Sequence, residues 1–409
     1  MTPGYKQTDA GVIPDDWDVK QLGELSSVSA GGTPSRSNAN YWGGDIPWIT
    51  TTEIDFRLIT ESEQFITSIG LKNSAAKLMP AGALLMALYG QGKTRGKVGV
   101  LGFEAATNQA CAAIILKEGY SREYAFHYLA SRYDEIRKLS NTGNQENLNG
   151  ALVRSIPVLL PPLSEQSAIA TALSDVDALL SSLDALIAKK RDIKQAAMQQ
   201  LLTGKTRLPG FEGEWTVKRL DQLANIRSGG TPSTTVSRFW DGGIPWCTPT
   251  DITRLGGGKY LLDTSRQITS EGLSNSSAEL IPANSVVMTS RATIGECAIN
   301  LKPVTTNQGF KNFVPFEDTE VNFLYYLLQT QKQGFIQLCA GSTFLEIGKT
   351  QLAAYKVHLP STKAEQSAIA EVLSDMDAEL AALEDRCDKT RLLKQGMMQE
   401  LLTGKTRLV

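Results

Sequence analysis

The 409-residue sequence lacks paired cysteines and long apolar runs, and it has only two histidines. Its five cysteines are scattered and form no Cys-x-x-Cys pair, so we expect reduced, buried thiols rather than a disulfide framework or a zinc cluster. His127 and His358 lie among apolar neighbours, which favours structural over catalytic roles. No apolar run approaches the ~18 residues of a membrane span, and the polar segment 1–11 does not resemble a signal peptide. We therefore expect a cytoplasmic protein without a metal site.

Motifs of common catalytic and nucleotide-binding sites are also missing. The Gly-Lys-Thr triplets that begin at Gly92, Gly204, Gly348 and Gly404 lack the glycine that a Walker A loop carries five residues earlier. The glycines of residues 90–96 miss the dinucleotide-binding spacing and favour a hairpin loop. The sequence has neither the Asn/Asp-Pro-Pro-Tyr/Phe loop of adenine methyltransferases nor a His-Glu-x-x-His motif. These absences argue against a catalytic or nucleotide-binding chain.

Composition and net charge restrict the class of protein less strongly than these missing motifs. A hydrophobic content of 42% and a charged content of 21% are typical of a globular protein, and the length suits two or three domains. The net charge of -2 counts against a protein that binds DNA alone, because DNA affinity comes largely from neutralising phosphates. A role in DNA binding would therefore require locally sorted charge or basic partners.

The same sequence occurs twice in the chain. Residues 165–208 return at 365–408 with a constant offset of 200, no gap and more than half of the positions identical. The segments that precede the two copies match more loosely, with small changes in offset that insertions in loops would produce. The matching pairs begin at Trp17 and Trp215, Gly31 and Gly229 (Gly-Gly-Thr-Pro-Ser), Tyr41 and Phe239, and Thr107 and Thr306 (Thr-Asn-Gln). The chain is thus ordered as globular region, helix, globular region, helix.

Each copy of the repeated segment predicts a long coiled-coil helix. Apolar residues recur at alternating spacings of four and three, which is the seam of a left-handed coiled coil. Prolines precede both segments, Thr362 with Glu365 predicts a capping box, and a Leu-Thr-Gly sequence ends each helix. The seam residues are Ile169, Leu173, Val176, Leu180, Leu183 and Ile187 in the first copy, and Ile369, Leu373, Met376, Leu380 and Leu383 in the second.

Charge sorting along these helices indicates how they pair. The front half of each segment is acidic and the rear half is basic, so antiparallel packing sets opposite charges against each other. Complementarity to the helix dipole is an alternative explanation. Pro3-Gly4-Tyr5 also matches Pro209-Gly210-Phe211 of the internal linker. We therefore predict that the two ends of the given sequence, which begins at residues 1–4 and ends at residues 408–409, meet where the internal linker runs in the other half, in a pseudo-two-fold arrangement.

The motif pairs that begin at Trp17 and Trp215, Gly31 and Gly229, Tyr41 and Phe239, and Thr107 and Thr306 precede the two copies of the long helix in the same order. This ordered set, given twice, resembles the specificity subunit of Type I restriction–modification enzymes over essentially the whole chain. The resemblance implies an α/β (α+β) fold in which two globular target-recognition domains are separated by two long antiparallel coiled-coil helices. The domains would span residues 1–161 and 209–361, and the helical spacers residues 162–208 and 362–409.

The resemblance also implies a function. The chain would be a non-catalytic subunit that binds double-stranded DNA at an asymmetric bipartite site and docks two modification (methyltransferase) subunits, with restriction subunits joining them. The chain itself would hold no cofactor, since S-adenosylmethionine and ATP are expected on the partner subunits.

Three pairs of loops are candidate DNA contacts. The Gly/Pro turns allow close backbone approach, although turns that only shape the fold fit equally well. Loops that follow an apolar strand carry Arg, Lys and Gln, which can bind guanine, phosphate or adenine; solvated loops are the alternative. The third pair is residues 141–147 and 341–344, just before the strand that leads to each helix; density of Asn and Gln favours contact with base edges, and ordinary polar loops are the alternative. The residues are Gly32, Thr33, Ser35, Gly230, Thr231 and Ser233; Tyr89, Gln91, Lys93, Arg95, Lys97, Ser290, Arg291 and Thr293; and Asn144, Gln145, Ser342 and Thr343.

Nearby residues favour structural roles. Trp42, Trp48, Trp240 and Trp246 are expected to pack at the core or its rim, with stacking on bases as the alternative. The Asn-Gln pairs at 108–109 and 307–308 are expected to brace the loops, with DNA contact as the alternative. Two other classes of function stay open at this point. One is a methyltransferase or nuclease that acts alone, and the other is a two-lobed scaffold or carbohydrate-binding repeat protein.

Overall fold

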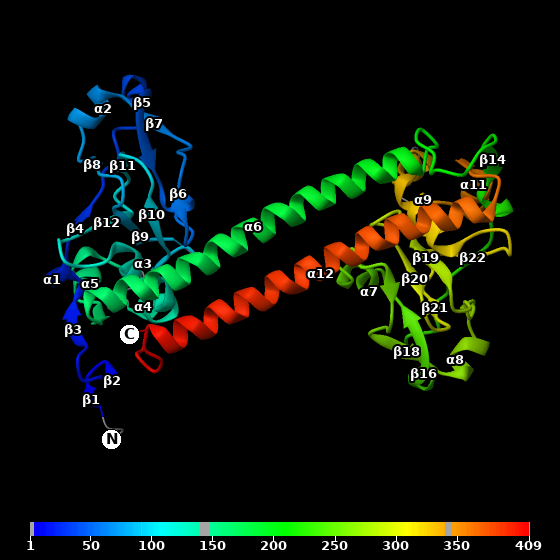
Figure 1. The fold of residues 1–409 in the computed structure, drawn as a ribbon. Coiled ribbons are helices and arrows are strands. Elements are labelled where there is room, and N and C mark those ends of the chain that lie inside the picture. Colours follow the sequence, from blue (N-terminus) through cyan, green and yellow to red (C-terminus); the bar gives the residue numbers. More distant parts are fainter. Residues whose placement is uncertain (1–3, 91, 140–146, 340–345, 409) are drawn as a thin grey trace. The chain divides into compact units, whose positions relative to one another are not determined.

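The chain folds into two compact units. The computed structural model describes residues 4–90, 92–139, 147–339 and 346–408. Unit 1 comprises residues 1–184 with 385–409, and unit 2 comprises residues 185–384. Each unit holds one α/β domain together with parts of two long helices, α6 (Leu163–Leu201) and α12 (Lys363–Leu401) (Figure 1). Among the described residues, no helix is both long and apolar enough to cross a membrane.

The domain of unit 1 is built on a five-stranded sheet in the order β4-β12-β9-β10-β6. Its central strand β9 is buried on both faces, because successive side chains point to opposite sides of a strand. Leu84 and Met86 pack with the helices, including α3 and α6, whereas Leu85 and Ala87 pack with a second, smaller sheet. The strands are β4 (Ser26–Ala30), β12 (Cys111–Leu116), β9 (Leu84–Ala87), β10 (Val98–Leu101) and β6 (Leu58–Ile59).

The remaining elements of unit 1 surround this sheet. The smaller sheet has the order β7-β5-β11-β8, and β1 pairs with β2 and β3 with β13. The strands are β7 (Phe65–Ile66), β5 (Trp42–Ile49), β11 (Ala105–Thr107), β8 (Leu78–Met79), β1 (Tyr5–Thr8), β2 (Gly11–Pro14), β3 (Asp18–Gln21) and β13 (Pro157–Leu160). The helices are α1 (Leu22–Leu25), α2 (Ser68–Lys72), α3 (Arg122–Ser131), α4 (Tyr133–Lys138) and α5 (Gly150–Arg154), with single 3-10 turns η1 (Ala39–Tyr41) and η2 (Thr51–Glu53).

The domain of unit 2 repeats this plan with its sheet in the order β15-β22-β19-β20-β17. The small sheet is β18-β16-β21, and β14 pairs with β23. The strands are β14 (Thr216–Arg219), β15 (Ala224–Ser228), β16 (Trp240–Cys247), β17 (Tyr260–Leu261), β18 (Arg266–Ile268), β19 (Ser285–Thr289), β20 (Cys297–Asn300), β21 (Thr305–Thr306), β22 (Phe310–Pro315) and β23 (Lys356–Leu359). The helices are α7 (Pro249–Arg254), α8 (Ser270–Ser274), α9 (Val321–Thr330), α10 (Lys332–Leu338) and α11 (Lys349–Ala354), with η3 (Leu220–Gln222) and η4 (Ser237–Phe239).

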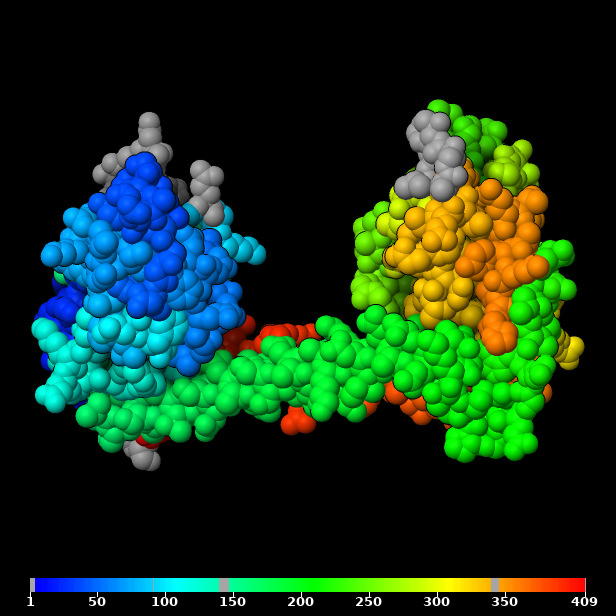
Figure 2. Space-filling view, turned by 90° about the horizontal axis from the view of Figure 1, so that it is seen from above, coloured from blue at the N-terminus to red at the C-terminus, as the bar shows by residue number. Residues whose placement is uncertain are grey.

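Helices α6 and α12 run antiparallel within each unit. In unit 1, Asp177 pairs with Lys394 at 2.6 Å and Asp184 with Arg391 at 2.9 Å, so a later residue of α6 meets an earlier one of α12. The corresponding pairs in unit 2 are Lys194 with Asp377 and Arg191 with Glu384, and Lys190 also pairs with Glu379. These ion pairs confirm the antiparallel pairing that charge sorting predicts. One flank of α6 beside the unit 1 domain is left uncovered (Figure 2).

The predicted seam is buried or half-buried along its whole length. Its first two positions in each helix do more than pair the helices, because they belong to the domain cores: Ile169 and Leu173 in unit 1, and Ile369 and Leu373 in unit 2. The two long helices and the two α/β domains confirm the expected fold class. The residue limits proposed above for the four segments remain predictions.

One local prediction is wrong. The side chain of Thr362 accepts a hydrogen bond from the backbone N–H of Glu365 at 3.3 Å, as in a capping box. The Glu365 carboxylate does not complete the box; it instead accepts bonds from Arg207 and from the Trp215 indole. The local sequence pattern could not show this, because both partners lie about 150 residues earlier in the chain.

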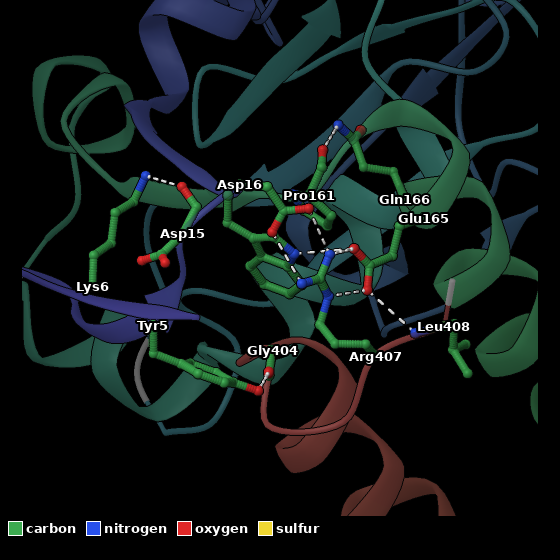
Figure 3. A network of polar contacts seen from close by, with 11 residues as sticks. Tyr5, Lys6, Asp15, Asp16, Pro161, Glu165, Gln166, Gly404, Arg407 and Leu408 are labelled. Atoms are coloured by element: carbon green, nitrogen blue, oxygen red, sulfur yellow. Dashed lines mark hydrogen bonds and ion pairs between the residues drawn. The ribbon is translucent and has the colours of Figure 1, made fainter. Parts of the chain in front are cut away.

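The equivalent carboxylate of unit 1 joins early and late segments of the chain (Figure 3). Glu165 accepts hydrogen bonds from the Trp17 indole at 3.0 Å and from the Arg407 guanidinium at 2.7 and 2.8 Å. Arg407 also pairs with Asp16, which lowers the pKa of that carboxyl, and the Tyr5 hydroxyl donates to the Gly404 carbonyl at 3.0 Å. The predicted meeting of these two segments is confirmed.

Candidate nucleic-acid interface

The Gly-Gly-Thr-Pro-Ser turns lie against the rest of each domain. A Cβ added to Gly32 would lie 2.3 Å from the backbone carbon of Ala75, so the buried glycine is required for packing. The Trp48 indole donates to the Gly32 carbonyl at 2.9 Å, and Thr33 donates to Gln109. Ser35 is exposed. Close backbone approach therefore occurs, but the partner is the protein's own chain.

The turn of unit 2 repeats this arrangement. Gly230 is buried and accepts a bond from the Trp246 indole at 2.9 Å, Thr231 donates to Gln308, and Ser233 is exposed. These bonds confirm that the glutamines brace the turns.

A tryptophan pair with an arginine stacked on it lies beside each turn. In unit 1, Trp42 and Trp48 meet edge to face, with ring centroids 5.0 Å apart, and the Arg36 guanidinium lies 3.7 Å from the centre of the Trp42 ring. The Trp42 indole donates to the Ser35 carbonyl at 3.1 Å. Trp48 is buried and Trp42 half-buried, which confirms the expected packing role. Arg36 is exposed and donates through Nη2 to Gln64 Oε1 at 2.7 Å, and its other N–H groups can bind a ligand.

Unit 2 forms the same stack from a different part of its sequence. Arg266 of β18 lies 3.8 Å from the centre of the Trp240 ring, which meets Trp246 edge to face. The residue that follows the second Gly-Gly-Thr-Pro-Ser motif, where Arg36 stands in the first, is Thr234. Arg36 and Arg266 are exposed cations that the sequence analysis missed, since the repeat comparison does not align them. We name each assembly an Arg–Trp stack.

The predicted loop between β9 and β10 is a hairpin loop in the structure. Tyr89 and Lys93 are exposed, which suits DNA contact. Lys97 pairs with Asp55 at 2.6 Å. Arg95 is 8% exposed and donates to the Arg137 carbonyl at 3.0 Å, so it supports the loop from within.

The equivalent loop of unit 2 presents a different surface. Arg291 is exposed and pairs with Glu346 at 2.9 Å, and Thr293 is exposed beside it. Ser290 is fully buried, so its side chain does not face solvent. Ala292 adopts a left-handed φ of 56°, which costs energy for a residue with a side chain and is found at functional sites. Burial lowers the pKa of Lys311, whose Nζ lies 4.0 Å from Glu346.

Five predicted contact residues lie outside the described part of the chain. They are Gln91, Asn144, Gln145, Ser342 and Thr343. The structure therefore gives each domain an exposed Arg–Trp stack and an exposed basic loop, but it does not bring every predicted residue to the surface.

Comparison with known proteins assigns the chain to a family. The profile of the Type I restriction modification DNA specificity domain matches residues 14–190 and again residues 212–389. The MjaIX specificity subunit of Methanocaldococcus jannaschii is 36% identical over 166 residues, which are 40% of this chain and 38% of that protein. The putative MjaX specificity subunit of the same organism is 22% identical over 99% of this chain and 97% of its own length. The EcoR124I/EcoR124II specificity subunit of Escherichia coli is 28% identical over 43% of this chain and 45% of that protein.

Solved structures share the fold. The S subunit of a Type I restriction–modification system from M. genitalium superposes with a TM-score of 0.61 at 14% identity, over 98% of this chain and 99% of that chain. A second solved chain comes from a structural study of complex assembly and conformational transition of the type I R-M system. It superposes with a TM-score of 0.61 at 18% identity, over 96% of this chain and 99% of that chain. The two profile matches cover most of the sequence, one in each unit, so the chain belongs to the family of Type I restriction–modification specificity subunits and carries two DNA specificity domains.

Proposed function

We propose that the chain selects an asymmetric, bipartite DNA site, with one half-site for each domain. The observation that carries the proposal is that the two domains share one fold but differ in their exposed loops. Unit 1 presents Tyr89 and Lys93, whereas unit 2 presents Arg291 and Thr293. Since side chains at base edges decide sequence preference, different loops on one scaffold support different half-sites.

The long helices support a second part of the proposal, that two modification subunits dock on this chain. A two-helix coiled coil needs apolar residues at only two positions of seven. Helix α6 has a further stripe at seven-residue spacing, formed by Leu179, Leu186 and Ile193, which are 39%, 38% and 43% exposed. Leu392 and Leu393 of α12 are 67% and 59% exposed. Such additional stripes are typical of helices that pack against further helices.

The chain itself performs no catalysis in this proposal, and the modification subunit holds S-adenosylmethionine. Methyl transfer to DNA by the purified chain alone, measured with labelled S-adenosylmethionine, would overturn this part. The bipartite site is tested by mapping methylated positions made by the chain with its modification subunit. Exchange of residues 209–360 for those of another family member should change one half-site and leave the other intact. A change in both half-sites, or in neither, contradicts the assignment.

The Arg–Trp stacks give a separate prediction. A guanidinium held against an indole ring is pre-ordered and can bind a phosphate through its exposed N–H groups. Arg36→Ala and Arg266→Ala should each weaken DNA binding about equally for all sequences and lower the slope of log affinity against log salt by about 1. Titrations at several salt concentrations measure this slope, with Arg238→Ala as control because Arg238 is exposed but paired with Glu271. A changed base preference with an unchanged slope would contradict a phosphate contact.

A further inference from the structure

Buried polar contacts join a short helix of each domain to its long helix at two separate points, in addition to the apolar packing of the first seam residues in the domain cores. In unit 1 the first point is the start of α3. Gln166 of α6, which is 3% exposed, accepts a bond from the backbone N–H of Ser121 at 3.0 Å and donates to the Pro161 carbonyl at 2.9 Å. Ser121 is also the cap of α3, through a bond from the Tyr124 N–H. One buried amide thus links the long helix to the beginning of the short one.

The second point lies further along the same two helices. His127 of α3 contacts Ser174 of α6 through Nε2 at 3.1 Å, and its Nδ1 lies 3.9 Å from the Asp177 carboxylate. Asp177 pairs in turn with Lys394 of α12 at 2.6 Å. Serine, histidine and aspartate also form hydrolase triads. Here the imidazole is 2% exposed between two helices, so the group has no access for a substrate and serves as a structural link.

Unit 2 has the same two points, with different chemistry at the second. Gln366 accepts a bond from the backbone N–H of Glu320, the cap of α9, at 3.0 Å. The Tyr326 hydroxyl, which takes the place of His127, donates to Asp377 at 2.5 Å. Asp377 also pairs with Lys194 of α6. Lys259 adds a bond to Ser374 at 2.7 Å, and burial lowers the pKa of this lysine.

Two points of attachment fix an angle, whereas one would permit rotation. Positions 166 and 174–177 of α6 are eight to eleven residues apart, which corresponds to roughly 12–17 Å along the helix. A domain is about 30 Å across, so a swing of about 10° would move its far side by about 5 Å. That displacement exceeds the rise of about 3.4 Å per base pair. A change of about 10° in the angle between domain and helix would therefore change which base pair the domain reaches.

We propose that Gln166 and His127 in unit 1, and Gln366 and Tyr326 in unit 2, are positioning residues that set the angle of each domain on its helix and so the gap length that the chain accepts. This inference rests on the proposed bipartite site. It assigns gap discrimination partly to the domain–helix junctions, and not to helix length alone. None of the four residues contacts DNA in this account, so base preference within each half-site should not depend on them.

The test uses the full chain with its modification subunit, after the methylated site has been mapped. Methylation rates are measured on duplexes with the mapped gap and with one base pair added or removed. Tyr326→Phe, which removes one hydroxyl, and Gln166→Ala should each reduce the preference for the mapped gap by about tenfold, because each variant loses buried hydrogen bonds at the junction. Substitutions at single positions of either half-site should be rejected as strongly as before.

Gln199→Ala is the matched control, because Gln199 is an exposed glutamine on the same helix. Circular dichroism and thermal unfolding check that each variant is folded, and Tyr326→Phe keeps the test informative if Gln166→Ala does not fold. Slower methylation with an unchanged gap preference would show a purely structural role and overturn the inference. If the complex formed by the chain without substitutions methylates duplexes of all gap lengths at the same rate, the proposed bipartite function fails, and the inference fails with it.

Discussion

An Arg407→Ala variant should lower the stability of unit 1 by about 3 kcal/mol, because it leaves the Glu165 carboxylate buried without a cation. The Glu165 side chain is 1% exposed, and Arg407 supplies two of its hydrogen bonds. Leu408 N and the Trp17 indole would remain as donors, but neither carries a charge. Hydrogen exchange followed by mass spectrometry measures the effect, since it resolves the opening of each unit separately.

The internal linker offers a matched comparison. Arg207 donates hydrogen bonds to the Glu365 carboxylate at 2.5 and 2.7 Å, as Arg407 does to Glu165. Arg207, however, lies in the internal linker, which joins α6 covalently to β14. Arg207→Ala should destabilise unit 2 by a similar amount without increasing exchange at residues 404–408. Arg407→Ala should increase exchange at residues 404–408 and at residues 5–16. If Arg407→Ala changes the stability of unit 1 by less than about 1 kcal/mol, the pair is worth no more than a surface ion pair and this account of the junction is wrong.

Acidification from pH 7 to pH 5 should cost unit 1 about 2 kcal/mol through His127. Burial, with a smaller contribution from Lys394, lowers the pKa of His127 from 6.5 to about 4, although Asp177 and Glu123 act in the opposite direction. Between these two pKa values the unfolded chain binds a proton that the folded chain does not. The contribution of neutral His127 to the free energy of unfolding is therefore fully present above pH 6.5 and is lost progressively as the pH falls towards 4.

His127→Tyr is the natural control, because unit 2 has Tyr326 at the equivalent position. The variant should lose most of the pH dependence of unit 1 between pH 7 and 5, as followed by hydrogen exchange or urea unfolding of the full chain. The same pH dependence in the variant would show that other groups are responsible.

The internal repeat made the architecture predictable, because it identifies two domains and two helices without any local assignment. The antiparallel pairing followed from charge, and the meeting of the two ends of the sequence followed from the linker match. The capping box at Thr362 failed, since a local pattern cannot show that Glu365 is bound by Arg207. Both outcomes have one cause: the repeat carries information on long-range contacts, and a four-residue motif does not.

The candidate interface was less predictable. Arg95 was expected in a DNA-contacting loop, but its guanidinium turns inward to a backbone carbonyl. Arg36 and Arg266 occupy the same place on a tryptophan from positions that do not align. Arg36 reaches Trp42 from the loop before η1, whereas Arg266 reaches Trp240 through the pairing of β16 with β18, so these side-chain positions had to come from the fold.

We propose as the central claim that the two long helices, as spacers between the domains, set the distance between the two half-sites, and lengthening both helices tests it most directly. One heptad inserted after Ala188 and another after Ala382 lie between the pairs Asp184–Arg391 and Lys190–Glu379 and preserve the seam. Seven residues add roughly 10 Å of helix, or about three base pairs of DNA. Mapping of methylated sites should show a gap longer by about three base pairs between unchanged half-sites. An unchanged gap, or new half-site sequences, would contradict the account.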